Sequence, residues 1–194
     1  DLAKLTVRLG KKSLGEIEGL SRRRLETLPL GVLVLERLLK IAKPQTLLFS
    51  AYGLREGFLY STLDAEAQAA DPLLVGCADL AGADGRFGSV SDQLDDWIMG
   101  LFRTEGHARA RLREAACLLS DIAWREHPDY RPEQAFTRAL RLPVAGITHS
   151  ERVTVALILA IRYGGYADAA FIDPVRSLLA EEDVAFAQRV GTTI

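Results

Sequence analysis

The chain has 194 residues, of which 48% are hydrophobic and 26% charged, and its formal net charge is −2. These values lie near the globular average and exclude a disordered tail, a collagen-like repeat and a pure coiled coil. The length fits one ordinary domain or two small ones, because domains usually have about 100–150 residues. Cys77 and Cys117 are too few for a disulfide scaffold and lack metal-ligand spacing, which favours core positions in a reducing compartment, the cytoplasm.

The charge is distributed unevenly along the chain. Residues 1–43 carry ten Lys or Arg against five Asp or Glu, residues 44–100 carry two against nine, and residues 101–194 carry twelve of each. The basic first segment favours an anionic partner, although its lysines and arginines could also serve only to solvate helix faces. The chain has no apolar run of membrane-spanning length and no secretory signal, so no membrane partner is expected.

The first third is expected to combine helices with one strand. The capping-box spacing at 13–16 predicts a short helix over 14–18. Pro29 should kink or divide the longer helix that follows, which ends before Pro44. The apolar run 46–50 predicts a buried strand, and the segment 53–59 then follows its carboxyl end, where α/β proteins bind ligands. One buried stripe is predicted on the longer helix: Leu25, Leu28, Val32, Leu35 and Leu39.

The rest of the chain predicts a connector followed by helices. Residues 64–88 are acidic, small and Gly-rich, which is typical of a connector, and we place a domain boundary there. Ser150 is expected to cap one of the later helices, and residues 181–194 look helical but end without a C-cap, as a truncated chain would. Three apolar stripes are predicted: Leu94, Trp97, Ile98 and Leu101; Leu112, Ala116, Leu119 and Ala123; Val153, Leu157, Ala160 and Ile161. Phe102 and Trp124 are also expected in the core.

His107, Asp121 and His149 have the layout of the HD phosphohydrolases, in which histidines and aspartates bind a divalent metal that activates water. The histidine expected before the aspartate is Ser120, whose hydroxyl is a poor transition-metal ligand. We therefore expect an HD-like scaffold without its metal, in which these polar groups are hydrogen-bonded within a helical bundle. An HD-type metal phosphohydrolase is an alternative, and a non-catalytic helical dimerisation or regulatory module is another.

Two segments together resemble a known family. Residues 19–31, GLSRRRLETLPLG, and residues 49–57, FSAYGLREG, are similar to the closing part of the actin-like region of exopolyphosphatases and guanosine pentaphosphate phosphatases. The helical segment with LLSDI at 118–122 resembles the domain that follows, including in members whose HD pair is degraded. The resemblance implies a mainly α protein with a small α/β part. Residues 1–66 would be the end of an actin-like (ribonuclease H-like) ATPase-fold domain, and residues 67–194 an HD-like all-helical domain.

The resemblance also implies an activity and a site. The family is a Mg²⁺-dependent hydrolase that removes terminal phosphate from inorganic polyphosphate or guanosine pentaphosphate with a glutamate-activated water. Its glutamate, metal carboxylates and phosphate loops belong to an N-terminal half whose motifs do not occur here, so we expect no catalytic or metal-binding residue and no activity of this chain alone. Arg24 aligns with a family arginine that approaches the phosphate chain, and Arg55 is the second candidate, unless Glu56 holds it in an ion pair. Arg22 and Arg23 are weaker candidates.

The expected partners are polyphosphate or guanosine pentaphosphate, the protein's own N-terminal half, and a second copy in a homodimer. No nucleic acid is expected.

Overall fold

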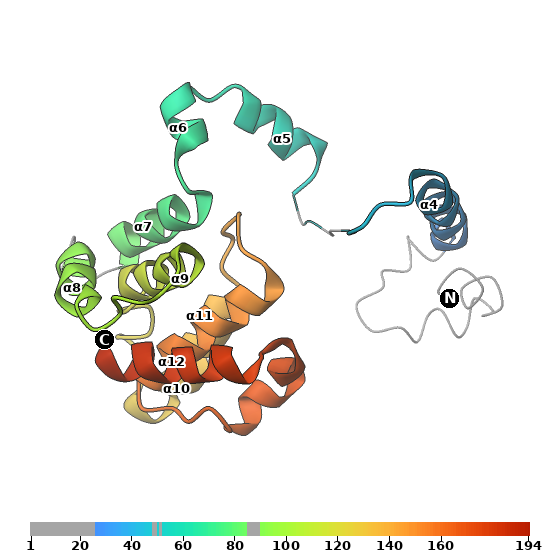
Figure 1. Ribbon diagram of the computed structural model, residues 1–194. Helices are drawn as coiled ribbons and strands as arrows, with labels where there is room; N and C mark the ends of the chain where they lie inside the picture. The colour runs from blue at the N-terminus through green and yellow to red at the C-terminus, as the bar shows by residue number, and fades with distance from the viewer. Residues whose placement is uncertain (1–25, 48–49, 51, 85–89) are drawn as a thin grey trace. The chain divides into compact units, whose positions relative to one another are not determined.

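The computed structural model describes residues 26–47, 50, 52–84 and 90–194 (Figure 1). The chain divides into two compact units, residues 1–51 and residues 52–194, and each is described by itself. All regular structure in the described ranges is helical. The α-helices are α4 (Leu28–Ala42), α5 (Leu54–Ser61), α6 (Ala65–Ala69), α7 (Pro72–Asp84), α8 (Val90–Met99), α9 (His107–Leu118), α10 (Arg131–Leu140), α11 (His149–Arg162) and α12 (Glu181–Thr193); η1 (Pro128–Tyr130) and η2 (Ala170–Leu178) are 3₁₀-helices.

The predicted small α/β part is not seen in the described residues. Thr46, Leu47 and Ser50 are not in a strand, and residues 48–49 lie outside the described ranges. A strand is held by hydrogen bonds to a neighbouring strand, and the described residues supply no such neighbour. The short helix predicted over 14–18 also lies outside the described residues.

Helix α4 begins later than its apolar pattern suggested. Pro29 lies in its first turn, where the missing N–H removes no intrahelical bond, so it neither kinks nor divides the helix. Lys43 ends α4 in the left-handed conformation, with φ of 44°, directly before Pro44. The predicted stripe is the more sheltered face of α4, but Val32 and its neighbours on that face are only half-buried, and no residue of the helix is buried.

Helix α7 corrects part of the prediction of a connector at 64–88, whereas α6 is exposed and residues 85–89 lie outside the described ranges. Leu73 and Cys77, at the start and in the middle of α7, are 1% and 0% exposed. Alanines and glycines in the rest of α7 dilute the helical pattern, which is why composition alone favoured a linker. Helix α7 packs against α9, so the stretch 72–84 belongs to the packed core of its unit. We call residues 72–194 the helical body.

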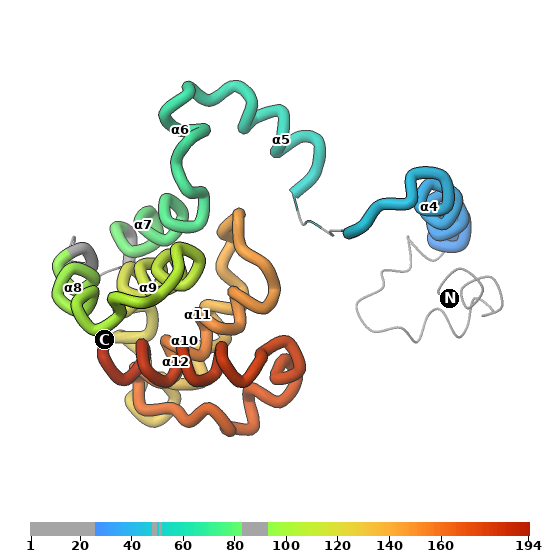
Figure 2. Tube along the Cα trace, viewed as in Figure 1, coloured from blue at the N-terminus to red at the C-terminus, as the bar shows by residue number. Residues whose placement is uncertain are grey.

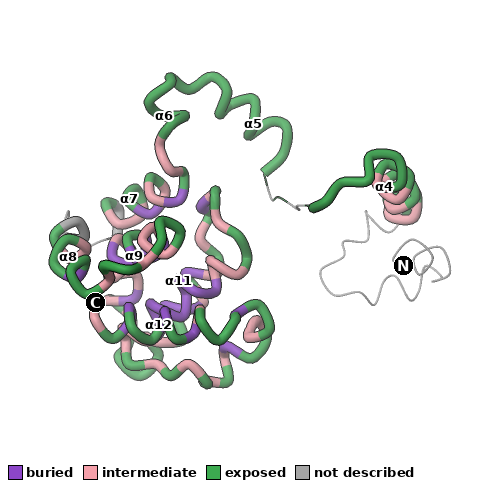
Figure 3. The backbone as a smooth tube through the Cα atoms, in the orientation of Figure 1, coloured by how far each residue is buried: buried purple, intermediate pink, exposed green. Residues whose placement is uncertain are grey.

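Helix α11 is the centre of the helical body. Every residue from Val153 to Ala160 is buried, and α9, α10 and α12 pack around the helix (Figure 3). Helix α12 lies close to it at Gly191, where a Cβ atom would lie 2.6 Å from the carbonyl oxygen of Ile158. The stripes predicted at 112–123 and 153–160 are therefore confirmed as core, whereas Ile161 is half-buried. The predicted helix over residues 181–194 is also confirmed.

The start of α11 differs from the prediction. Thr148, not Ser150, is its N-cap: the Thr148 hydroxyl accepts the Glu151 N–H at 3.2 Å, and the Glu151 carboxylate accepts the Thr148 N–H at 2.8 Å. This reciprocal capping box satisfies two N–H groups at the helix start. Ser150 instead lies in the first turn and accepts the Thr154 hydroxyl through its carbonyl oxygen.

Helix α8 places most of its predicted stripe outside the core. Ile98 is fully buried, whereas Trp97 is 76% exposed and Leu101 is 74% exposed. Leu101 lies beyond the last helical residue, Met99, so it does not continue the helical face. The prediction of core positions for Trp97 and Leu101 is therefore wrong, while Phe102 and Trp124 are half-buried. Among the described helices, none is both long and apolar enough to cross a membrane.

Candidate phosphate-binding site

Of the two predicted phosphate-binding arginines, the structure describes Arg55 and does not describe Arg24. Arg24, together with Arg22 and Arg23, lies outside the described residues. Arg55 lies in the first turn of α5, so it belongs to a helix rather than to the loop that the sequence suggested. Its side chain is exposed and forms no ion pair with any described residue.

Glu56 caps α5 instead of pairing with Arg55. Its carboxylate accepts the Gly53 N–H at 2.7 Å across the helix start. The pKa of Glu56 is lowered by hydrogen bonds from its own backbone N–H and from that of Gly53, which stabilise the ionised form. The Glu56 carboxylate, which could have paired with Arg55, is thus hydrogen-bonded to the backbone instead. The N–H donors of the Arg55 guanidinium are therefore available to another group.

The surroundings of Arg55 hold charges of both signs. The amino end of a helix carries a partial positive charge, and an anion bound there is stabilised by the helix end and by a guanidinium together. The Glu56 carboxylate already lies across this helix end, so it opposes a second anion there. The Arg55 guanidinium is therefore the group of this turn that is suited to a phosphate.

The HD-like residues are not brought together. His107 and His149 are each the first residue of a helix, α9 and α11, and both are exposed. Ser120 and Asp121 lie in the turn after α9, whereas the HD pattern needs them on a helix. No three His, Cys, Asp or Glu side chains in the described ranges gather closely enough to hold a metal ion.

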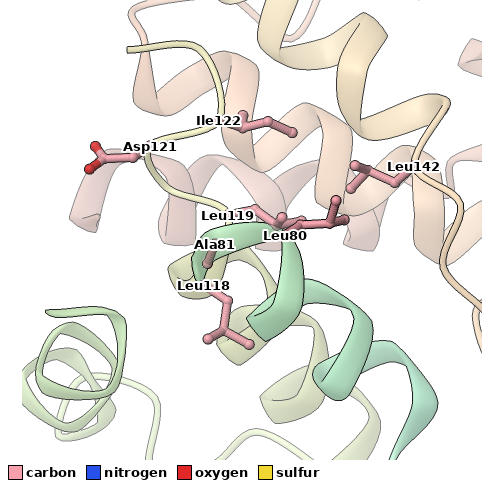
Figure 4. A pocket seen from close by; sticks show the side chains of 7 residues that line it. All are labelled: Leu80, Ala81, Leu118, Leu119, Asp121, Ile122 and Leu142. Carbon is pink, nitrogen blue, oxygen red and sulfur yellow. The ribbon is translucent and has the colours of Figure 1, made fainter. Parts of the chain in front are cut away.

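The hollow beside Asp121 is apolar and small. It has a volume of about 40 Å³ and is lined otherwise by leucine, isoleucine and alanine side chains (Figure 4). Figure 4 shows the Asp121 carboxylate directed away from the other labelled side chains. A water molecule occupies about 30 Å³ in the liquid, so this hollow cannot take a chain of phosphates. It lies between the end of α7 and the turn after α9, and packing explains it.

Both cysteines are structural. Cys77 and Cys117 are free thiols with no exposed surface. Desolvation raises the pKa of each to about 12, so neither is a thiolate at neutral pH. The prediction of small core residues is confirmed.

Many arginine side chains of the helical body donate hydrogen bonds to backbone carbonyl groups, so those donors are not available to a ligand. Arg131, for example, donates to the carbonyl oxygens of Trp124 at 2.9 Å and Glu126 at 2.8 Å, and Arg162 donates to that of Ser120 at 2.7 Å. These bonds satisfy carbonyl groups of the irregular turn 119–127, visible in Figure 2 between α9 and α10. In the part of the body that the structure describes, Arg125, Arg141 and Arg189 have no such bond. The others with a carbonyl or carboxylate partner are Arg103, Arg109, Arg111, Arg113, Arg138, Arg152 and Arg176.

Sequence reasoning missed Arg111, which joins three segments of the body. Its guanidinium forms an ion pair with Asp71 before α7, donates to the carbonyl oxygen of Gly146, and lies 3.9 Å from Glu151 of α11. Arg111 and Asp71 are forty residues apart, so no local pattern could have revealed the pair. The hydrogen bond from Arg111 lowers the pKa of Asp71, which keeps the carboxylate ionised.

Two family models match most of the chain. The family model described as "Exopolyphosphatase, C-terminal" matches residues 77–194, and the one described as "Ppx/GppA phosphatase family" matches residues 1–66. Comparison with curated proteins gave no match. The exopolyphosphatase model covers more than half of the chain, and the second model matches the segment before it. The chain therefore belongs to the Ppx/GppA phosphatase family, in the part of it that includes the exopolyphosphatase C-terminal region.

Proposed function

We propose that this chain is part of a phosphatase that hydrolyses the terminal phosphoanhydride bond of inorganic polyphosphate or of guanosine pentaphosphate. The observation that carries the proposal is the order of the two matched families along one chain, phosphatase family first and exopolyphosphatase C-terminal region second. The basic segment at residues 1–43 supports a polyanionic substrate. Both substrates present the same terminal phosphate chemistry.

We assign residues 1–66 to the end of an actin-like domain and residues 67–194 to an HD-like helical domain. The limits of the two family matches, 66 and 77, support a boundary in this interval. In this arrangement Arg24 and Arg55 belong to the actin-like domain, and we assign both to the binding of substrate phosphates. Each guanidinium binds two oxygens of one phosphate, which positions the chain without taking part in bond cleavage.

The catalytic glutamate, the phosphate loops and the Mg²⁺ ligands would be supplied by sequence outside these 194 residues. Mg²⁺ is bound through carboxylate oxygens together with substrate phosphates. The described residues offer no gathered set of acidic side chains for it. The same observation weighs against an HD-type metal phosphohydrolase, since His107, Asp121 and His149 would have to converge on one ion.

An activity assay tests whether the catalytic groups lie outside these 194 residues. The 194-residue chain alone should release no phosphate from polyphosphate or guanosine pentaphosphate with Mg²⁺, while a polypeptide that also carries the N-terminal half should turn over. In that longer protein, Arg55→Gln should raise KM about tenfold or more with little change in kcat, because a charged hydrogen bond contributes about 1.5–3 kcal/mol.

Arg37→Gln is the matched control, because Arg37 is also an exposed helical arginine of this chain. Its kinetics should equal those of the unmodified protein. Turnover by the isolated chain would refute the assignment of the catalytic glutamate and the Mg²⁺ ligands to sequence outside it. Equal effects of the two arginine variants would refute the role of Arg55.

A further inference from the structure

A hollow of about 290 Å³ lies at the amino end of α9. It is lined by residues of the segment just before α9, of α9 itself and of α12, and we call it the α9 hollow. Its volume equals that of about ten water molecules in the liquid, which is room for a small metabolite. Its apolar lining consists of Leu101, Phe102 and Phe186, and its polar lining carries charges of both signs.

The acidic residue of the α9 hollow, Glu105, has an oxygen without a hydrogen-bond donor. The Glu105 side chain is only 9% exposed, and its Oε1 accepts the Nε–H of Arg113 at 2.6 Å. Its Oε2 is buried and, among the side chains that the structure describes, is the single buried polar atom without a partner. Buried carboxylate oxygens are normally paired, so this oxygen calls for a donor from outside the chain, such as an ammonium group.

The amino end of α9, directly after Glu105, lacks an acceptor. Its N-cap is Gly106, and no described side chain accepts an N–H group of the first turn. The free N–H groups and the partial positive charge of a helix end favour an anion. A missing donor and a missing acceptor thus lie at neighbouring positions of the same hollow.

The two arginines of the α9 hollow differ in how far their charge is already balanced. Arg109 donates to the carbonyl oxygen of Glu182 at 3.1 Å and lies 3.5 Å from the Asp183 carboxylate. Its guanidinium also covers the Phe186 ring, 5.0 Å from the centroid, so it is fixed against α12. The side chain of Arg189 is exposed and has no hydrogen bond or ion pair with a described residue. Arg189 is therefore the arginine that can turn toward an anion.

We propose that the α9 hollow binds a free α-amino acid with an apolar side chain. The ammonium group donates to Oε2 of Glu105, and the carboxylate accepts the N–H groups at the start of α9 and pairs with Arg189. The apolar side chain of the ligand lies against Leu101 and Phe102. An amino acid carries both charged groups on one carbon atom, which suits an acceptor and a helix end that are consecutive in the sequence.

The proposed site is separate from the proposed hydrolysis. It contains neither Arg24 nor Arg55 and holds no catalytic group. A chain of phosphates is a poorer ligand for it, because phosphate oxygens offer no donor to Glu105 and are repelled by its carboxylate. The ligand is therefore a zwitterion rather than an anion.

Calorimetric titration of the 194-residue chain with L-leucine and two analogues tests the ligand class. Leucine should give saturable heat with one site per chain. Leucine amide lacks the carboxylate and N-acetyl-leucine lacks the ammonium group, so each should bind at least tenfold more weakly. Glycine, which lacks the apolar side chain, should also bind about tenfold more weakly or less. Equal binding of N-acetyl-leucine would show a simple anion site and overturn the proposal, as would the absence of saturable heat with both leucine and phenylalanine.

Two charge variants test the assigned residues. Glu105→Gln should weaken leucine binding at least tenfold, and Arg189→Gln should weaken it about fivefold. Arg141→Gln is the matched control, because Arg141 is an equally exposed arginine outside the hollow, and it should leave the affinity unchanged. Equal affinities of the Arg189 and Arg141 variants would contradict the role of Arg189.

A third variant remains informative if Glu105→Gln unfolds the protein through its bond with Arg113. Gly106→Asp fits the extended backbone of the N-cap, with φ of −77°, and nothing lies within 4 Å of the added Cβ atom. The aspartate would cap α9, so it should raise the melting temperature while it weakens leucine binding at least tenfold by taking the place of the carboxylate. A raised melting temperature with unchanged leucine affinity would overturn the proposal. Because calorimetry needs no turnover, the result does not depend on the proposed hydrolase activity.

Discussion

Helices α5 and α11 are built from similar proportions of apolar residues but differ in what they bury. Helix α11 has a continuous buried stretch from Val153 to Ala160, whereas α5 has no buried residue and exposes 92% of Leu54 and 67% of Phe58. An isolated helix as short as α5 is marginal in water, because nucleation costs more than a few hydrogen bonds return. The helical body supplies its own packing, while α5 is stabilised locally by Glu56 and the turn to α6.

The strongest way to break the body is to remove its most buried charge. Arg113, 4% exposed, forms ion pairs with Asp95 of α8 and with Glu105 at 2.6 Å. Arg113→Met would leave both carboxylates without a counter-charge, and we expect a loss of about 3–5 kcal/mol in the free energy of unfolding. Urea denaturation followed by circular dichroism measures it. Arg125→Gln, at an exposed position, should change it by less than about 0.5 kcal/mol, and equal losses would contradict the prediction.

One substitution made in both helices tests the comparison directly. Leu157→Ala in α11 removes a fully buried side chain and should cost about 2–5 kcal/mol of stability. Leu59→Ala in α5 removes one that is 64% exposed and should cost less than about 0.5 kcal/mol. The two unfolding curves, recorded under identical conditions, give the difference. A cost at Leu59 as large as that at Leu157 would mean that α5 packs within this chain.

The ion pair between Arg111 and Asp71 should make the body sensitive to acid. Because the folded-state pKa of Asp71 is lowered, its contribution is complete above the ordinary aspartate pKa of about 3.9 and is lost as the pH falls through the lowered value. Asp71→Asn should therefore cost about 1 kcal/mol at pH 6 and progressively less toward pH 3. Melting temperatures across this range test it, with the exposed Asp168→Asn as control. A constant difference would contradict the linkage.

The smallest expected effect on stability concerns the exposed end of α8. Trp97 is 76% exposed, and we expect its ring to contribute to the proposed homodimer. Trp97→Ser should leave the melting temperature almost unchanged and shift the protein toward the monomer in sizing chromatography. Tyr166→Ser is the control, because Tyr166 is also an exposed aromatic residue and follows α11 in the sequence. A strict monomer before substitution would refute the homodimer.

The sequence predicted those helices whose buried faces repeat regularly. Leu112, Ala116 and Leu119 follow helical spacing, and all three are buried as expected. The same rule failed at Trp97. The spacing of apolar residues identifies one face of a helix, but it does not show whether another element covers that face. It also failed in α7, where alanines and glycines dilute the helical pattern of the apolar residues. The N-cap Thr148 could have been found, since Thr148 and Glu151 have capping-box spacing in the sequence.

The candidate site was predictable only in part. Arg55 was identified from a family motif, but its helical position depends on Gly53 and Glu56 acting together at the start of α5. Arg111 was missed entirely. Its guanidinium joins Asp71, Gly146 and Glu151, which belong to segments far apart in the sequence. Contacts of this kind depend on tertiary packing and leave no local signal.

The bonds from Arg131 to the turn 119–127 fix the number of residues that the turn can contain. A guanidinium reaches Trp124 and Glu126 at once because its donors form a rigid fork, which the single ammonium of lysine cannot reproduce. Inserting or deleting one residue would move a carbonyl group out of this fork and leave it unsatisfied. Length variation among relatives should therefore concentrate in other connections of the body, and attachment points for tags or labels are better chosen near Tyr166, which is 75% exposed.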